Sequence, residues 1–182
     1  MPILHSRTVR ITQWLHALCF VALTISGAGI LLAHPRFYWG EDGYFDTAAA
    51  FVLPFAANTH HTTWGRGVHF FAAWIVVLNG LTYVVWGLAT KHFRLENYGV
   101  TQRRTHLIVV FVLFPLVVLT GLTMSPGITA AFPWLFTMFG GRQSARTIHF
   151  LVSNALVLFA IGHVAMVIRA SFRDKMPSMI AV

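Results

Sequence analysis

Four apolar stretches, each long enough to cross a lipid bilayer, limit what this chain can fold into. They run from about residue 11 to 33, 68 to 89, 106 to 124 and 147 to 170, and a spanning helix needs about 20 mostly apolar residues. Only 10% of the residues are charged, whereas a soluble domain typically carries about 25%. The sequence therefore predicts an all-α membrane protein, an antiparallel four-helix transmembrane bundle built as a single domain from residues 1–182.

The basic residues lie beside the apolar stretches and predict how the chain crosses the membrane. The side with the N-terminus, the second connection and the C-terminus holds nine of the thirteen basic residues: Arg7, Arg10, Lys91, Arg94, Arg103, Arg104, Arg169, Arg173 and Lys175. Loops rich in lysine and arginine stay in the cytoplasm, so we expect both termini there. No dense basic face is present, which excludes nucleic-acid binding, and membrane lipid is the expected surrounding.

The first connection, residues 35–67, is long and acidic. It carries Glu41, Asp42 and Asp46 on the predicted outer side. Its middle, residues 48–57, is apolar but too short to span a bilayer, so we expect an interfacial segment. The third connection contains two prolines and a glycine pair, which predicts an interfacial loop or a short re-entrant turn.

Four of the ten histidines, His16, His69, His149 and His163, lie inside the predicted spans. Ionisable residues within a span are costly and usually functional. His149 and His163 are fourteen residues apart, which puts both on nearly one helix face, about 21 Å apart along the axis. Two haems stacked through a bilayer core of about 30 Å need such a separation. Ligands so far apart cannot share a zinc ion, and Cys19 as the only cysteine excludes a cysteine-ligated cluster.

One histidine pair is predicted near the cytoplasmic surface. His16 follows Arg10 by six residues, and His163 precedes Arg169 by six. The two histidines therefore lie at matching depths in the first and fourth spans. We expect His16 and His163 to be the two axial ligands of one haem iron.

The second pair is predicted near the outer surface. His69 follows Arg66 by three residues, and His149 follows Arg146 by three, so these two histidines also match in depth and are the expected ligands of a second haem iron. Residues three apart are neighbours on a helix. Arg66 and Arg146 are therefore candidates to bind haem propionates through charge-assisted hydrogen bonds, although both arginines would equally mark the lipid interface.

Two glycines fit the same arrangement. Gly27 follows His16 by eleven residues and Gly80 follows His69 by eleven, so each glycine shares its histidine's face about 16 Å further along the helix. Each of the first two spans would then offer a ligand at one level and a gap without a side chain at the other. Glycine permits close approach of the backbone, so Gly27 and Gly80 are predicted to pack against haem.

Histidines in membrane bundles have other uses. They form hydrogen bonds between helices and take part in proton relays. Four histidines at paired depths, with complementary glycines, favour two haems over these alternatives. Two histidines per iron fill both axial positions, which suits electron transfer better than oxygen binding.

At these residues the chain resembles the bacterial cytochrome b561 and nickel-hydrogenase or formate-dehydrogenase cytochrome b family, and is most similar to cytochrome b subunits of the thiosulfate-reductase type. The segment Arg10-Ile-Thr-Gln-Trp-Leu-His16 resembles the opening motif of the family, and His149 with His163 resembles its twin-histidine helix. In that family the first and second helices each give one haem ligand and the fourth gives two. The resemblance thus implies two haem b groups held by His16, His69, His149 and His163.

The resemblance also implies a quinone as substrate or bound ligand. Family members oxidise or reduce quinone near one haem, often on the cytoplasmic side. The candidates here are His106, Arg103, Arg104 and Asn97, at the cytoplasmic start of the third span. His106 would bond a quinone carbonyl or relay a proton, or alternatively cap a helix or meet a propionate.

The function that the resemblance implies is electron transfer between the quinone pool and a periplasmic redox subunit, such as a molybdopterin or iron–sulfur protein. The chain would be the quinone-reactive subunit of an oxidoreductase complex in a bacterial inner membrane. One alternative is a stand-alone cytochrome b561 that passes electrons from superoxide to quinone, which the acidic first connection disfavours. The other is a haem-free transporter subunit, which the lack of an acidic residue inside any span disfavours.

Overall fold

Four helices in the part of the chain that the structure describes are long and apolar enough to cross a membrane. This structure is a computed structural model that describes residues 7–44, 47–55, 63–90 and 100–169. The candidate spans are Arg7–Ala33, Trp64–Ala89, Arg104–Thr123 and Arg142–Met166, and they confirm the four predicted spans. Each helix begins a few residues before its apolar stretch, because hydropathy marks only the part in hydrocarbon while helical hydrogen bonding continues into the interface.

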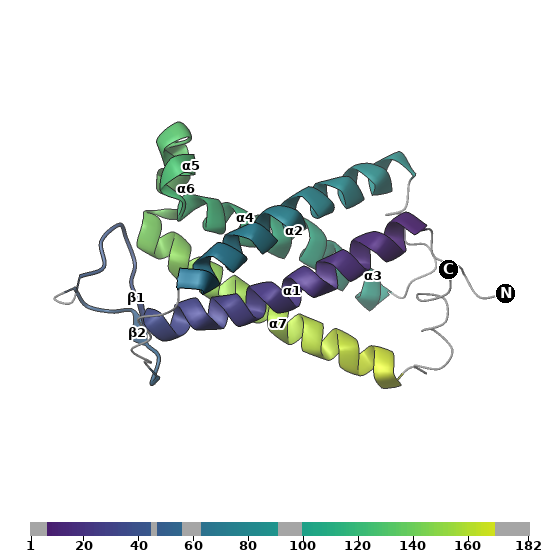
Figure 1. The fold of residues 1–182 in the computed structure, drawn as a ribbon, viewed down its shortest axis with the longest axis horizontal. Coiled ribbons are helices and arrows are strands. Elements are labelled where there is room, and N and C mark those ends of the chain that lie inside the picture. The colour runs from purple at the N-terminus through teal and green to yellow at the C-terminus, as the bar shows by residue number, and fades with distance from the viewer. Residues whose placement is uncertain (1–6, 45–46, 56–62, 91–99, 170–182) are drawn as a thin grey trace. The chain divides into compact units, whose positions relative to one another are not determined.

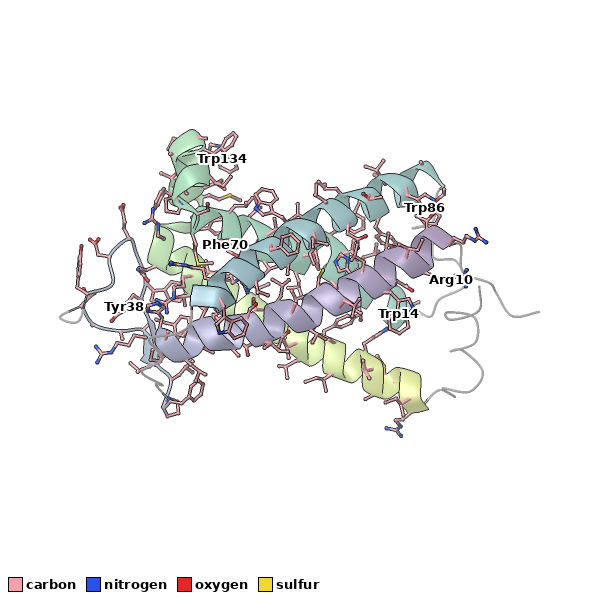
Figure 2. The ribbon with its side chains drawn as sticks, in the orientation of Figure 1. Arg10, Trp14, Tyr38, Phe70, Trp86 and Trp134 are labelled. Carbon is pink, nitrogen blue, oxygen red and sulfur yellow. The ribbon has the colours of Figure 1, made fainter. Side chains whose placement is uncertain are left out.

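The side chains of these helices are distributed as in a membrane protein. Large apolar groups remain exposed along them, including Trp14 at 45% and Phe70 at 45% (Figure 2). Several buried residues are instead small or polar, such as Ser26 and Thr120, which are both fully buried. Lipid gives no hydrophobic drive between helices, so small and hydrogen-bonding residues form the helix contacts.

The described residues form two compact units. The first comprises residues 7–28, 63–90 and 158–169, and the second comprises residues 29–44, 47–55 and 100–157. The first unit contains most of helix α1 (Arg7–Ala33), all of helix α2 (Thr63–Ala89) and the C-terminal part of helix α7 (Arg142–Arg169). Within it, the side chain of Asn79 on α2 donates a hydrogen bond to the carbonyl of Thr12 on α1 at 2.9 Å. A polar side chain thus joins the first two spans.

The third span, which lies in the second unit, is not a uniform α-helix. It consists of α3 (Val100–Ile108), a π-helical turn η2 (Val109–Leu113) and α4 (Phe114–Thr123). Pro115 cannot donate a backbone hydrogen bond to the carbonyl of Phe111, and its ring would clash with that carbonyl. The wider π turn directly before it relieves the clash.

The third connection contains two short helices, where the sequence predicted a loop or a re-entrant turn. They are α5 (Pro126–Ala131) and α6 (Trp134–Phe139). Helix α6 ends at Gly140, whose φ of 69° is left-handed. Glycine adopts this conformation without steric cost, so it stops the helix before α7 begins.

The first connection is held against the start of α7. It contains strands β1 (Arg36–Phe37) and β2 (Phe51–Val52), which pair antiparallel (Figure 1). The carbonyl of Gly40 accepts hydrogen bonds from the backbone N–H groups of Gln143 and Ser144, each at 3.1 Å. These N–H groups at a helix start have no partner within the helix, so the loop supplies the cap.

The apolar segment at residues 48–57, expected to be interfacial, contributes β2 to this loop, and its residues 56–57 lie outside the described residues. Aromatic stacking adds to the docking. The ring of Phe37 lies 4.7 Å from that of Phe51 and 4.5 Å from that of Phe150 on α7, between centroids. The loop is therefore a folded element of the second unit.

Candidate functional site

The four histidines predicted to bind haem all lie on long helices. His16 is on α1, His69 is on α2, and both His149 and His163 are on α7. The first three are partly buried and His163 is exposed. Because α7 is continuous from Arg142 to Arg169, the fourteen residues between its two histidines correspond to about 21 Å of helix.

In the first unit, His69 is seated by two consecutive residues of α1. The Oγ atom of Ser26 lies 3.1 Å from Nδ1 of His69, and the Ser26 hydroxyl donates its own proton to the carbonyl of Ala22 at 2.6 Å. A Cβ atom added to Gly27 would lie 3.5 Å from Cε1 of the same ring. The structure thus brings Gly27 together with His69, the histidine at whose level the helical repeat predicted it.

His16 is held by α2 in the same unit. The side-chain nitrogen of Asn79 lies 2.6 Å from Nδ1 of His16, and the same amide nitrogen donates to the carbonyl of Thr12. Asn79 is only 8% exposed, so this contact is shielded from solvent. Gly80, the other glycine predicted to pack against haem, directly follows Asn79 and is partly buried.

In the second unit, α4 holds His149 in the way that α1 holds His69. The Oγ1 atom of Thr120 lies 3.1 Å from Nδ1 of His149, and the carbonyl of Val117 lies 2.9 Å from the same nitrogen. The Thr120 hydroxyl donates its proton to the carbonyl of Leu116 at 2.7 Å. A Cβ atom on Gly121 would lie 3.4 Å from Cε1 of His149. In each unit, a serine or threonine followed by glycine therefore contacts and positions a histidine.

These contacts determine which ring nitrogen carries the proton. A carbonyl oxygen only accepts hydrogen bonds, so Nδ1 of His149 must donate to Val117. Ser26 has committed its hydroxyl proton to Ala22, so its oxygen accepts from Nδ1 of His69. A neutral imidazole protonated on Nδ1 carries its lone pair on Nε2. Both rings are thus in the tautomer that coordinates a metal through Nε2.

His163 differs from the other three histidines. In the described part of the chain, the contact of its side chain is with the ring of Phe159, one turn earlier on α7, at 5.7 Å between centroids. Because His163 is exposed, the structure leaves room around its imidazole. It lies six residues before Arg169, the last residue of α7.

The two arginines that precede the outer histidines have different surroundings. Arg66 lies on α2 one turn before His69 and is exposed. Arg146 lies on α7, donates a hydrogen bond to the carbonyl of His34, and places its guanidinium 5.0 Å from the centre of the Phe37 ring. Arg146 therefore helps to dock the first connection, a contact that the sequence did not indicate.

The residues predicted to bind quinone are only partly described. His106 is partly buried in the last turn of α3, directly before η2. Arg103 and Arg104 lie on the same helix, where Arg104 is exposed. Asn97 lies outside the described residues. A π turn inside an α-helix often marks a functional site. The π turn η2 directly follows the turn that contains His106.

Sequence reasoning missed the side chains that hold the histidines: Ser26, Asn79 and Thr120. A signal was present, because each is a polar residue directly followed by glycine within an apolar stretch. The similarity of Leu-Asn-Gly-Leu-Thr at residues 78–82 and Leu-Thr-Gly-Leu-Thr at residues 119–123 would have drawn attention to two of the three. Polar residues in a span often bond only to their own helix, so the pattern alone did not identify their partners.

The chain is similar to a known protein family and to a bacterial protein, each over most of its length. A family model described as prokaryotic cytochrome b561 matches residues 4–181. A protein of Azospira oryzae, named as the putative protein-methionine-sulfoxide reductase subunit YedZ1, is 28% identical over 194 aligned positions, which cover 90% of this chain and 89% of the relative. Both similarities extend over nearly the whole chain.

Proposed function

The chain belongs to the prokaryotic cytochrome b561 family, and from that premise we propose that it is a two-haem subunit that transfers electrons between the quinone pool and a periplasmic redox partner. Its class is that of cytochrome b-type membrane electron-transfer subunits, with haem b as the cofactor that the family implies. The number of haems, the quinone and the partner are the parts we propose.

Four histidines would hold the two haem b groups. The proposed pairs are His16 with His163, near the cytoplasmic surface, and His69 with His149, near the outer surface. Bound haem supplies one-electron redox chemistry, and two imidazole ligands per iron favour electron transfer. The outer pair fits this use, because His69 and His149 are each in the tautomer that presents the Nε2 lone pair. This hydrogen bonding at Nδ1 is the observation that carries the proposal. At His16 the Asn79 amide nitrogen donates to Nδ1, so ligation through Nε2 there would require the opposite tautomer.

Other residues would complete the two sites. Gly27 and Gly80 would leave room beside the macrocycles, and the contact of Gly27 with His69 supports such a role. Arg66 is exposed on the turn before His69 and would pair with a propionate. Arg146 is a second propionate candidate. Its contact with the His34 carbonyl uses one of its nitrogens, and a guanidinium has five N–H donors, so others could bind a propionate.

Quinone would bind at the cytoplasmic end of the third span. His106, Arg103 and Asn97 are the proposed contacts, with His106 donating a hydrogen bond to a quinone carbonyl. Arg104 would add positive charge at the same end. The position of His106 at the junction of α3 with the π turn supports this choice, because such turns accompany functional sites.

The partner would be a periplasmic oxidoreductase subunit containing molybdopterin or an iron–sulfur centre. The relative in Azospira oryzae is named as a subunit of a reductase, which supports a complex. The first connection would receive this partner, since it is anchored on α7 and exposes Trp39, Glu41 and Asp42. The positive-inside distribution supports an inner-membrane orientation with both termini in the cytoplasm.

The test is a reduced-minus-oxidised visible spectrum of the purified protein, with haem measured per chain. We expect two low-spin b haems, falling to about one in His16→Ala, His163→Ala, His69→Ala or His149→Ala. The control is His34→Ala, at an exposed position beyond α1, which should keep two haems. A colourless protein would refute the proposal and favour a haem-free transporter subunit.

Double variants test the pairing itself. The variant that lacks His16 and His163 should retain one haem, because both losses affect the same iron. The variant that lacks His16 and His69 should retain none. The reverse result would show that the histidines are paired differently.

A further inference from the structure

Ser26 and Thr120 hold their histidines with nearly the same geometry, although they lie in different units of the structure. Each oxygen is 3.1 Å from Nδ1 of a proposed ligand, His69 for Ser26 and His149 for Thr120. We propose that these two hydroxyl groups are positioning residues that stabilise the Nδ1-protonated tautomer of the imidazoles, at His149 together with the Val117 carbonyl, and thereby lower the potential of the haem they bind. This inference rests on the proposed function, since it assigns a role in the same site.

The hydroxyl protons are committed elsewhere, which makes both oxygens acceptors. Ser26 donates to the carbonyl of Ala22 at 2.6 Å, and Thr120 donates to the carbonyl of Leu116 at 2.7 Å. Both residues are fully buried, so water does not compete for their lone pairs. Each oxygen can therefore receive the Nδ1 proton, which at His149 is shared with the carbonyl of Val117 at 2.9 Å.

The glycine that follows each hydroxyl residue also helps to position the imidazole. A Cβ atom on Gly27 or Gly121 would lie 3.5 or 3.4 Å from Cε1 of the ring that its neighbour holds. The absent side chain lets the imidazole lie against the helix backbone, next to the acceptor oxygen. Together, the oxygen and the bare backbone fix the direction in which Nε2 points.

The alternative to be tested is that these hydroxyl groups only bond to carbonyls of their own helix and do not affect the histidines. Serine and threonine in membrane helices commonly bond the carbonyl four residues earlier. Thr24 and Thr123 make this bond, to Phe20 at 2.8 Å and to Leu119 at 2.9 Å. They share a helix with Ser26 and Thr120 respectively, and Thr123 is equally buried. They are therefore matched controls.

The hydrogen bond has a predictable electronic effect. An acceptor at Nδ1 makes the ligating nitrogen more basic, which favours the oxidised iron. Removing the acceptor should therefore raise the midpoint potential of the haem concerned. A tenfold change in the ratio of oxidised to reduced ligand affinity corresponds to about 59 mV for a one-electron couple.

The experiment is a potentiometric titration of the haem-loaded, full-length protein. Ser26→Ala and Thr120→Val should each retain two haems and raise one potential by about 59 mV, a tenfold effect. Ser26→Thr and Thr120→Ser keep a hydroxyl and should restore the original value. Thr24→Ala and Thr123→Val should leave both potentials unchanged. Because His69 and His149 are proposed to share one iron, Ser26→Ala and Thr120→Val should shift the same haem.

The outcomes separate this inference from the proposed function. A wild-type protein with two haems, whose potentials are the same in Ser26→Ala and Thr120→Val, overturns the positioning role and leaves the haem assignment intact. Loss of one haem in both Ser26→Ala and Ser26→Thr would also overturn it, because a hydroxyl at this position would then not be sufficient to hold the imidazole. A wild-type protein without haem overturns both.

Discussion

The side-chain amide of Asn79 on α2 contacts Nδ1 of His16 on α1 at 2.6 Å and also donates to the carbonyl of Thr12 at 2.9 Å. One buried amide thus links two membrane spans and holds a proposed haem ligand. Hydrogen bonds between membrane helices contribute about 0.6 kcal/mol each on average. We therefore expect the loss of Asn79 to affect the position of the His16 imidazole more than the stability of the helix pair.

Replacing Asn79 by leucine should disturb the inner haem more than the fold. We expect Asn79→Leu to lower the free energy of unfolding by about 1 kcal/mol, and to weaken or lose the haem bound by His16 while the second haem remains. Haem content and thermal unfolding in detergent measure the two effects. Asn154→Leu is the control, because Asn154 is exposed and, among the residues that the structure describes, bonds to the carbonyl of Phe150 in its own helix. Equal haem loss in both variants would contradict the role of Asn79.

A bulky residue at Gly27 should displace His69. Alanine at this position would meet Cε1 at an ordinary contact distance of 3.5 Å, so Gly27→Ala should keep both haems. Leucine would need the volume that the imidazole occupies, so Gly27→Leu should lose about one haem per chain. Gly29→Leu is the control, since no described residue lies within 4 Å of its added Cβ. Two haems in Gly27→Leu would show that the contact is not required.

A side chain at Gly141 should release the first connection from α7. A Cβ atom there would lie 2.5 Å from the carbonyl carbon and oxygen of Gly40, and the φ of Gly141 is +110°. Backbone atoms cannot move aside as a flexible side chain does, so Gly141→Ala should destabilise the protein by about 1–3 kcal/mol.

The measurement for Gly141→Ala is the rate of proteolysis within residues 34–55, together with thermal unfolding. Gly127→Ala, at a position where no described residue lies within 4 Å of the added Cβ, is the matched variant and should behave like the wild type. If the loop docks the redox partner, Gly141→Ala should also weaken co-purification of that partner. An undocked loop with unchanged partner binding would exclude this surface.

Loss of the imidazole at position 106 should affect quinone and leave the haems unchanged. We expect His106→Ala to retain the wild-type visible spectrum and to slow quinol-dependent haem reduction about tenfold, as for the loss of about one strong hydrogen bond. Stopped-flow reduction by a quinol analogue measures this rate, and reduction by dithionite is the control. A normal quinol rate would remove His106 from the proposed quinone site.

Much of the fold and part of the candidate site were predictable from the sequence. The hydrophobic spans are visible because lipid selects apolar residues along the chain, and this is a one-dimensional signal. The depths of His16, His69, His149 and His163 are predicted from helical rise alone. The assignment of these histidines as haem ligands remains a prediction, which the family membership supports only as far as haem b.

Other features were beyond sequence reasoning because they depend on neighbouring segments. The π turn before Pro115 was missed, since hydropathy does not register a local change in helical pitch. The docking of Gly40 on the start of α7 was also missed, because it joins segments about a hundred residues apart through backbone groups that every residue has.

The sequence by itself determined the four apolar stretches that form the candidate membrane spans, and it predicted four histidines at paired depths. Both follow from hydropathy and helical rise, which can be read from each helix separately. Only the tertiary structure decided which polar side chain holds which imidazole: Ser26 for His69, Asn79 for His16 and Thr120 for His149. Thr24 and Ser26 are both hydroxyl residues that bond back to their own helix. They differ because Ser26 lies on the side of α1 that contacts His69 of α2. The sequence of α1 alone does not specify which side that is.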